Sequence, residues 1–181
     1  MPDRTKREIV AAFNRLIARS DMEKITTLRI AEEAEVSKAT FYRYFRDKYD
    51  VLVIFFEINY QEISRKYPDA KDYLMMMTEY FCLIRKYDSF FRKALSITGQ
   101  NSLMEYIYQG GYDYYVRQAE KREGRSITEQ ERMSIVMFTS GMVALINDWI
   151  RTGFATEPHE LALVAYESMP QWLGRCFVPE V

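Results

Sequence analysis

Small, basic and aromatic side chains gather on one face of a short helical pattern at residues 38–45. Phe41 and Phe45 are four residues apart, so they share one side of the helix, which predicts that this side is buried. The opposite side then presents Lys38, Ala39, Tyr42 and Arg43. Lys38 can donate to guanine edges or phosphates, and the methyl group of Ala39 can contact a thymine methyl. The set therefore suits contact with DNA.

Hydrogen-bond donors flank this face where the sugar-phosphate backbone of DNA would pass. They are Thr27, Ser37, Thr40, Tyr44 and Lys48. Together with Tyr42, we expect them to position the DNA backbone without reading its sequence. The helix that begins at Lys48 adds its N-terminal amides and their partial positive charge. Because few of these groups are charged, one copy would bind weakly, and two copies on a palindromic operator are expected.

A helix-turn-helix is the arrangement that would position these side chains. Apolar residues spaced by three and four predict three N-terminal helices, over about 4–19, 27–34 and 38–45. Glu35, Val36 and Ser37 form a short turn between the last two helices. Leu28 or Ile30 supplies the inner face of the second helix, together with two alanines that allow close crossing. In this motif the last helix enters the DNA major groove while the preceding one braces it.

Helical periodicity continues through the remainder of the chain. We expect further helices over about 48–67, 69–86, 88–97, 102–123, 128–153 and 158–177. No segment alternates with a period of two for long enough to form a sheet. The predicted fold class is all-α, with about nine helices. A three-helix DNA-binding bundle occupies residues 1–47, and a helical effector-binding and dimerisation domain occupies residues 48–181.

Charge permits DNA binding without requiring it. The net charge is −1, but residues 1–50 carry 11 basic and 9 acidic side chains, whereas residues 51–181 carry 14 and 17. An enzyme is not expected, because His159 is the only histidine and neither a glycine-rich phosphate loop nor an HExxH pattern occurs. We predict no cofactor and no metal site. An ordinary helical corner with surface tyrosines is the alternative interpretation of residues 26–48.

Composition indicates a protein of the reducing cytoplasm. Cys82 and Cys176 lie far apart without metal-binding spacing, so both are expected to be buried free thiols. No apolar run approaches the roughly 18 residues that span a bilayer, and the polar N-terminus shows no signal peptide. We therefore expect a cytoplasmic protein without membrane contact.

Residues 27–31 and 36–48 resemble the N-terminal signature of the TetR family of one-component regulators, and the resemblance extends from Thr5 to about Leu52. It implies three N-terminal helices for DNA, a helical C-terminal domain for an effector, and a dimer formed by the last two long helices. The phosphate- and base-contacting positions of the family fall here on Ser37, Lys38, Ala39, Thr40, Tyr42, Tyr44 and Lys48.

Two positions depart from that signature. Tyr44 stands where histidine is common, and it still donates a hydrogen bond. Glu35 stands where the turn often has glycine, so a positive φ there would strain the backbone. Farther along, residues 141–149 and the pair Thr152-Gly153 resemble the subgroup that includes dihydroxyacetone-kinase regulators, some of which respond to a partner protein.

Tyrosine, phenylalanine and methionine crowd the segment 73–115. Most of them have the helical spacing that any core needs. Tyrosine is amphipathic and methionine packs adaptably, so a pocket walled by them would suit a small apolar or aromatic effector. The predicted pocket residues are Tyr73, Met77, Tyr80, Phe81, Phe91, Tyr106, Tyr112 and Met142.

Small residues at 140, 141 and 144 would let two copies of the helix at 128–153 approach closely. With the last helix, they would form a four-helix seam between two subunits. The predicted interface comprises Met137, Gly141, Ala144, Leu145, Leu161, Ala165, Ser168, Met169 and Trp172. Packing of the same faces within one chain is the alternative.

The sequence therefore predicts a homodimeric, sequence-specific DNA-binding transcription regulator, a repressor released by a small-molecule effector. The alternative is a co-activator or protein-interaction module that responds to a partner protein. Effector binding beyond Pro68 would tilt the helix at 48–67 and change the separation of the two reading helices. These must lie about 34–36 Å apart to bind adjacent half-sites.

Overall fold

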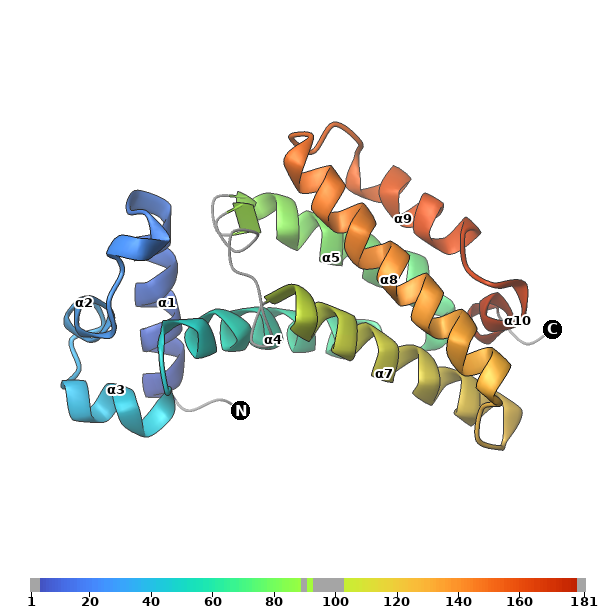
Figure 1. Ribbon diagram of the computed structural model, residues 1–181, viewed down its shortest axis with the longest axis horizontal. Helices are drawn as coiled ribbons and strands as arrows, with labels where there is room; N and C mark the ends of the chain where they lie inside the picture. The colour runs from blue at the N-terminus through green and yellow to red at the C-terminus, as the bar shows by residue number, and fades with distance from the viewer. Residues whose placement is uncertain (1–3, 89–90, 93–102, 179–181) are drawn as a thin grey trace. The chain divides into compact units, whose positions relative to one another are not determined.

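The computed structural model describes residues 4–88, 91–92 and 103–178, and every regular element among them is helical (Figure 1). The all-α fold class is thereby confirmed for these residues. The chain divides into two compact units. The first comprises Met1–Gln61 and Tyr87–Leu103, and the second comprises Glu62–Lys86 and Met104–Val181. The functional boundary predicted after residue 47 stays a prediction, because a packing unit need not coincide with a functional domain.

Three helices and most of a fourth belong to the first unit. They are α1 (Arg4–Arg19), α2 (Thr27–Glu33), α3 (Lys38–Tyr44) and α4 (Lys48–Lys66). Their bounds agree with the predicted helices to within one residue. A 3-10 turn, Met22–Lys24, precedes α2. α1 buries one continuous face, and α2 packs against both α1 and α3.

Side-chain caps fix where α2 and α3 begin. The Thr26 hydroxyl accepts a hydrogen bond from the Arg29 amide at 3.2 Å, and the Ser37 hydroxyl accepts one from the Thr40 amide at 3.0 Å. Each cap satisfies an amide that has no partner within its own helix. Local sequence therefore determines both helix starts.

The turn between α2 and α3 is a Schellman motif. The Val36 amide donates to the Ala31 carbonyl at 2.9 Å, and the Glu35 amide donates to the Glu32 carbonyl at 3.0 Å. Glu35 takes the left-handed conformation, with φ at 54°. A side chain in this region crowds the following carbonyl, so Glu35 carries the strain that the sequence suggests for a residue other than glycine.

The second unit contains α5 (Tyr73–Lys86), α8 (Glu129–Arg151), α9 (Pro158–Glu167) and all but the first residue of α7 (Leu103–Glu123). α5 and α9 pack closely together. The buried Tyr73 lies at the centre of an aromatic core. Its phenol oxygen is 2.7 Å from that of Tyr115, and its ring centroid is 4.6 Å from that of Phe177.

The prediction of one helix over 158–177 is wrong. α9 stops at Glu167, and a four-residue helix, α10 (Gln171–Gly174), and a 3-10 turn follow. Pro170 explains the break, because proline lacks the amide hydrogen and disfavours helix in the residue before it.

The helix predicted over 69–86 begins later, at Tyr73, after a 3-10 turn at Ala70–Asp72. The helix predicted over 88–97 lies mostly outside the described residues.

The expectation that both thiols are buried holds only for Cys176. Cys82 is exposed, because it lies on the side of α5 opposite the core residues Tyr80 and Ile84.

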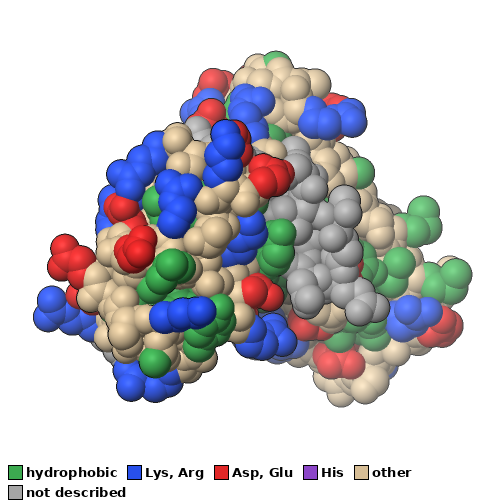
Figure 2. All heavy atoms as spheres, turned by 60° about the vertical axis from the view of Figure 1, so that its left-hand side comes forward, with side chains coloured by type: hydrophobic (Ala, Val, Ile, Leu, Met, Phe, Trp, Pro, Cys, Tyr) green, Lys and Arg blue, Asp and Glu red, His purple; other side chains and the backbone are tan. Residues whose placement is uncertain are grey.

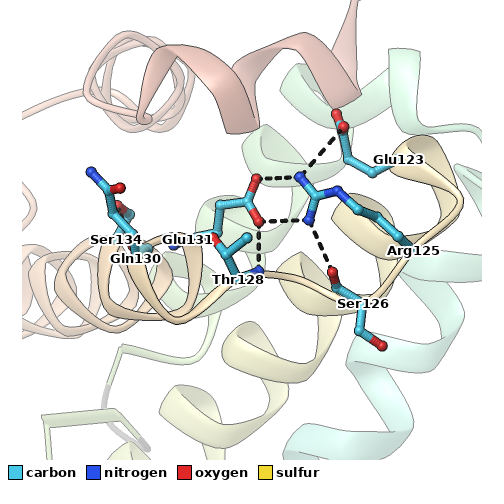
Figure 3. Close-up of polar contacts among 7 residues, drawn as sticks. All are labelled: Glu123, Arg125, Ser126, Thr128, Gln130, Glu131 and Ser134. Carbon is cyan, nitrogen blue, oxygen red and sulfur yellow. Dashed lines mark hydrogen bonds and ion pairs between the residues drawn. The ribbon is translucent and has the colours of Figure 1, made fainter.

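Arg125 joins the end of α7 to the start of α8 (Figure 3). Its guanidinium donates to the two carboxylate oxygens of Glu131 at 2.9 and 2.8 Å. Glu131 also accepts from the Thr128 amide at 2.7 Å, while the Thr128 hydroxyl accepts from the Glu131 amide. These two hydrogen bonds form a reciprocal capping box at the start of α8. Arg125, and secondly the Thr128 amide, lower the pKa of Glu131 to about 2.

α8 is the most apolar long helix among the described residues. By length and composition alone it could cross a membrane, but core helices of soluble proteins pass the same test. One side of α8 is buried, as at Ile135 and Ile146, whereas Met133 and Met137 on another side are 57% and 77% exposed. The helix therefore has a second apolar surface that its own chain does not cover.

Candidate nucleic-acid interface

The orientation of α3 is the one that the sequence predicts. Phe41 and Phe45 are 0% and 1% exposed, and their ring centroids lie 5.7 Å apart. The side chains exposed on α3 include Lys38, Ala39, Tyr42 and Arg43. Phe41 and Phe45 thus anchor α3 in the core of the first unit, and the opposite side of α3 exposes basic and aromatic side chains to solvent.

Lys38 and Arg43 supply the positive charge of this surface. No ion pair within the described part of the chain involves either residue. The Lys38 ammonium lies 5.9 Å from the ring centroid of Tyr42, and the Arg43 guanidinium lies 5.1 Å from that of the half-buried Tyr44. Both cations are therefore free of carboxylates and can approach an anion.

Hydroxyl groups connect the start of α2 with α3. The Thr27 hydroxyl and the Tyr42 phenol are 3.0 Å apart, which holds the Tyr42 side chain toward α2. The Ser37 hydroxyl lies 2.9 Å from that of Thr40 and also caps α3. The structure thus brings four of the predicted backbone-contacting residues together in two hydrogen-bonded pairs.

Lys48 has a structural role that its sequence position did not reveal. Its ammonium donates to the carbonyls of Met22 and Ile25 at 2.6 and 3.1 Å. These carbonyls belong to the connection between α1 and α2, so Lys48 ties the start of α4 to that connection. An ammonium has three N–H donors, so one remains for a phosphate. The predicted DNA contact of Lys48 stays a prediction.

A second brace lies between α1 and α2. Arg15 donates to the Glu33 carboxylate at 2.8 Å and to its backbone carbonyl at 3.1 Å, and Arg19 binds the same carboxylate. The hydrogen bond from Arg15 is the main reason that the pKa of Glu33 is lowered. The sequence shows Arg15 and Arg19 four residues apart on α1, but it does not reveal their shared partner on α2.

Figure 2 turns α1, α2 and α3 toward the viewer. Lys and Arg side chains are spread over this face, with fewer Asp and Glu side chains among them and an area of hydrophobic side chains, tyrosine included, between them. A surface with dispersed cations and apolar groups suits a groove of DNA better than a single concentrated anion. Among the described residues, no group of His, Cys, Asp and Glu is placed to hold a metal ion.

The predicted effector-pocket residues are divided between the two compact units. Phe91 belongs to the first unit, where its ring centroid is 6.0 Å from that of Phe56. The others belong to the second unit. Five of these are buried, namely Tyr73, Met77, Tyr80, Phe81 and Met142. The other two, Tyr106 and Tyr112, are half-buried. Their joint role in one pocket stays a prediction.

An apolar groove runs between α8 and α9, with a volume of about 470 Å³. Five of the predicted interface residues line it: Met137, Gly141, Leu145, Ala165 and Ser168. Ala144 is exposed on α8 beside it, and Trp172 is half-buried on α10. Leu161 and Met169 are buried within the chain, so packing within one subunit already uses part of the predicted face.

Two family models match the sequence. One, described as bacterial regulatory proteins of the tetR family, matches residues 9–53, and the other, described as a transcriptional regulator C-terminal region, matches residues 71–171. No curated protein matches the sequence significantly.

Solved structures share the fold at low identity. The dihydroxyacetone kinase operon activator DhaS is 17% identical over 92% of this chain and 94% of its own, with a TM-score of 0.68. FadR from Bacillus subtilis, solved with stearoyl-CoA, is 16% identical over 92% and 98%, with a TM-score of 0.57. NalD, the secondary repressor of the MexAB-OprM multidrug efflux pump in Pseudomonas aeruginosa, is 15% identical over 91% and 93%, with a TM-score of 0.55.

Proposed function

The chain belongs to the TetR family of bacterial regulatory proteins and is a DNA-binding transcriptional regulator, and we propose that it acts in the cytoplasm as a dimeric repressor released by a small-molecule effector. The proposed reading helix is α3. One observation carries this assignment: two buried phenylalanines fix α3, and its other side exposes Lys38 and Arg43, neither of which pairs with a carboxylate among the described residues.

In this proposal each predicted residue has a role set by its chemistry. Lys38 and Ala39, at the start of α3, meet base edges, since the first residues of a reading helix reach deepest into the groove. Arg43 binds a phosphate or a base edge. The remaining contacts go to the DNA backbone and come from Thr27, Ser37, Thr40, Tyr42, Tyr44 and Lys48.

The groove between α8 and α9 supports the proposed dimer. Met137 and Val164 are 77% and 46% exposed there. At Gly141 no described atom beyond the neighbouring residues and backbone of α8 itself lies within 4 Å of the position that a Cβ would take, so that site is open. Apolar surface of this kind is expected at a subunit interface, and a twofold axis would bring the same surface of two subunits together.

A buried hydroxyl supports a ligand in the second unit. Thr139 on α8 is 2% exposed, and its oxygen has no hydrogen-bond partner among the described residues. Its methyl group lies 3.3 Å from the position that a Cβ on Gly111 would take, so a side chain at position 111 would crowd Thr139. Buried polar groups are nearly always paired, and a polar atom of an effector would satisfy this one.

α4 is the proposed link between effector and DNA. This single helix belongs to the first unit up to Gln61 and to the second unit from Glu62. Effector binding that moves the second part of α4 would also move its first turn, where Lys48 is tied to the carbonyls of Met22 and Ile25. The separation of the two α3 helices would then depart from the roughly 34–36 Å that adjacent half-sites need.

A co-activator that responds to a partner protein is the second candidate. The similarity to an operon activator, DhaS, favours it. The two candidates differ in the signal that changes their activity. A repressor binds its operator without a partner and releases it when a small molecule binds. A partner-dependent regulator changes transcription only when the second protein is present.

Selection of binding sites from randomised DNA tests the proposal. We expect the purified protein to enrich a palindrome with half-sites about ten base pairs apart at physiological salt. Lys38→Ala and Arg43→Ala together should abolish the enrichment, whereas Lys121→Ala, which removes an exposed cation from α7, should leave it intact. A folded dimer that enriches no sequence, alone or in cell extract, would contradict the proposal.

A further inference from the structure

Leu28 is exposed at the start of α2, although it is a large aliphatic residue. The sequence offers Leu28 or Ile30 for the inner face of this helix. The structure buries Ile30 completely and leaves Leu28 50% exposed. The side chain of Leu28 therefore contributes little to the core of the first unit and remains available for contact with a partner.

Leu28 directly follows the residue that ties the start of α2 to the exposed side of α3. The preceding residue, Thr27, has its hydroxyl 3.0 Å from the phenol of Tyr42, which is itself 48% exposed. Among the described residues of the first unit, Leu28 and Tyr42 are the large hydrophobic side chains with this much exposure. The hydrogen bond holds Tyr42 against the residue that precedes Leu28, so the first turn of α2 is tied to the exposed side of α3.

DNA offers one prominent apolar group in the major groove, the C5 methyl of thymine. Phosphates and the other base-edge groups in that groove are polar and would gain nothing from a leucine. We infer that Leu28 contacts a thymine methyl and so reads an A·T pair in each half-site, beside the base pairs that α3 meets. This assignment rests on the proposed placement of α3 in the major groove.

Replacing thymine by uracil removes only the methyl group and leaves base pairing unchanged. The probe is the palindrome obtained by selection, with uracil placed at one thymine position at a time in both half-sites, and affinity is measured by fluorescence anisotropy. We expect one position where uracil lowers the affinity of the unaltered protein roughly 10-fold, which corresponds to the loss of one buried methyl contact in each half-site.

The variant Leu28→Ala should bind the thymine operator with a similar loss and should no longer distinguish thymine from uracil at that position. It should still distinguish them at a thymine read by Ala39. Leu28→Met, which keeps an apolar side chain of similar size, should retain most of the discrimination. Met75→Ala is the matched control, because Met75 is 51% exposed but lies in the second unit.

The outcomes separate the two proposals. If the unaltered protein binds the operator but Leu28→Ala keeps the full thymine preference at every position, the assignment of Leu28 is wrong and the DNA-binding face stands. Equal weakening on thymine and uracil operators would place Leu28 against the sugar-phosphate backbone and would also overturn the assignment. If the unaltered protein binds no DNA, the placement of α3 fails and the assignment fails with it.

Discussion

Lys38 and Lys48 carry the same charge but differ in their surroundings. Lys38 is exposed on α3 and has no carboxylate partner in the described part of the chain, whereas Lys48 is half-buried and donates to the carbonyls of Met22 and Ile25. One is available to an anion, and the other also stabilises the fold. At the scale of single residues, a substitution of Lys38 should therefore affect DNA binding, whereas a substitution of Lys48 should also affect the stability of the fold.

We predict that Lys48→Ala lowers the free energy of unfolding by about 1–3 kcal/mol, because two carbonyls lose a charged donor. Lys38→Ala should leave the stability within about 0.5 kcal/mol, weaken binding to the selected palindrome by about 1–3 kcal/mol and relax specificity at the base pair that Lys38 meets. Urea unfolding and titrations with single-base operator variants measure the two effects. Equal stability of both variants would contradict the structural role of Lys48.

Glu35 is a second residue whose conformation leads to a prediction. Its φ of 54° suits glycine, so Glu35→Gly should raise the free energy of unfolding by roughly 0.5–1 kcal/mol despite the greater freedom of the unfolded chain. Glu32→Gly, three residues earlier within α2, should lower it by about 1 kcal/mol. Urea unfolding of the two variants should thus give changes of opposite sign, and two decreases would contradict the strain.

At the scale of elements, the connection from α7 to α8 depends on one carboxylate. Glu131 accepts hydrogen bonds from Arg125 and from the Thr128 amide, and together these hold its pKa at about 2 instead of 4.5 (Figure 3). A pKa that is lower in the folded state means that the ionised carboxylate stabilises the fold. This contribution is complete above the ordinary pKa and disappears as pH falls toward 2.

We therefore predict that Glu131→Gln destabilises the protein at pH 6 and that the difference from the unaltered protein shrinks between pH 4.5 and 2. Urea unfolding at a series of pH values measures this difference. In the Arg125→Gln background the pKa of Glu131 should rise toward its ordinary value. The difference should then be smaller at pH 6 and, as pH falls, should disappear at a higher pH than it does with Arg125 present. A difference that is independent of pH would show that Glu131 acts through packing alone.

At the scale of the whole molecule, the groove between α8 and α9 bears on assembly. Met137 is 77% exposed, so a change there should leave the fold of one subunit intact. If two copies meet at this groove, Met137→Glu buries a charge at the interface. We predict that it weakens dimerisation at least about 10-fold and lowers operator affinity with it.

Analytical ultracentrifugation over a range of concentrations measures this effect. Met75→Glu is the control, because it places the same charge at another exposed methionine, which is on α5 and does not line the groove. A Met137→Glu protein that remains dimeric would exclude the groove as the subunit interface. Loss of the dimer with both variants would point to a general loss of folding.

Much of the local structure of this protein can be predicted from its sequence, because the interactions that determine it are between residues close together in the chain. The bounds of α1 to α4, the caps at Thr26 and Ser37 and the buried side of α3 all depend on residues three or four positions apart. The strain at Glu35 was visible for the same reason, since turn geometry depends on a few consecutive residues. Family membership also follows from a continuous string of residues around α3.

Only the tertiary structure showed the contacts and the burial that depend on residues far apart in the sequence. Lys48 meets Met22 and Ile25 more than 20 positions away, and periodicity did not decide between Leu28 and Ile30 for the inner face of α2. The same holds for the uncovered side of α8: its apolar pattern is visible in the sequence, but which residues remain exposed depends on how α9 packs beside it. Burial is a property of the assembled chain, because the same hydrophobic pattern can be covered by its own subunit or left for another.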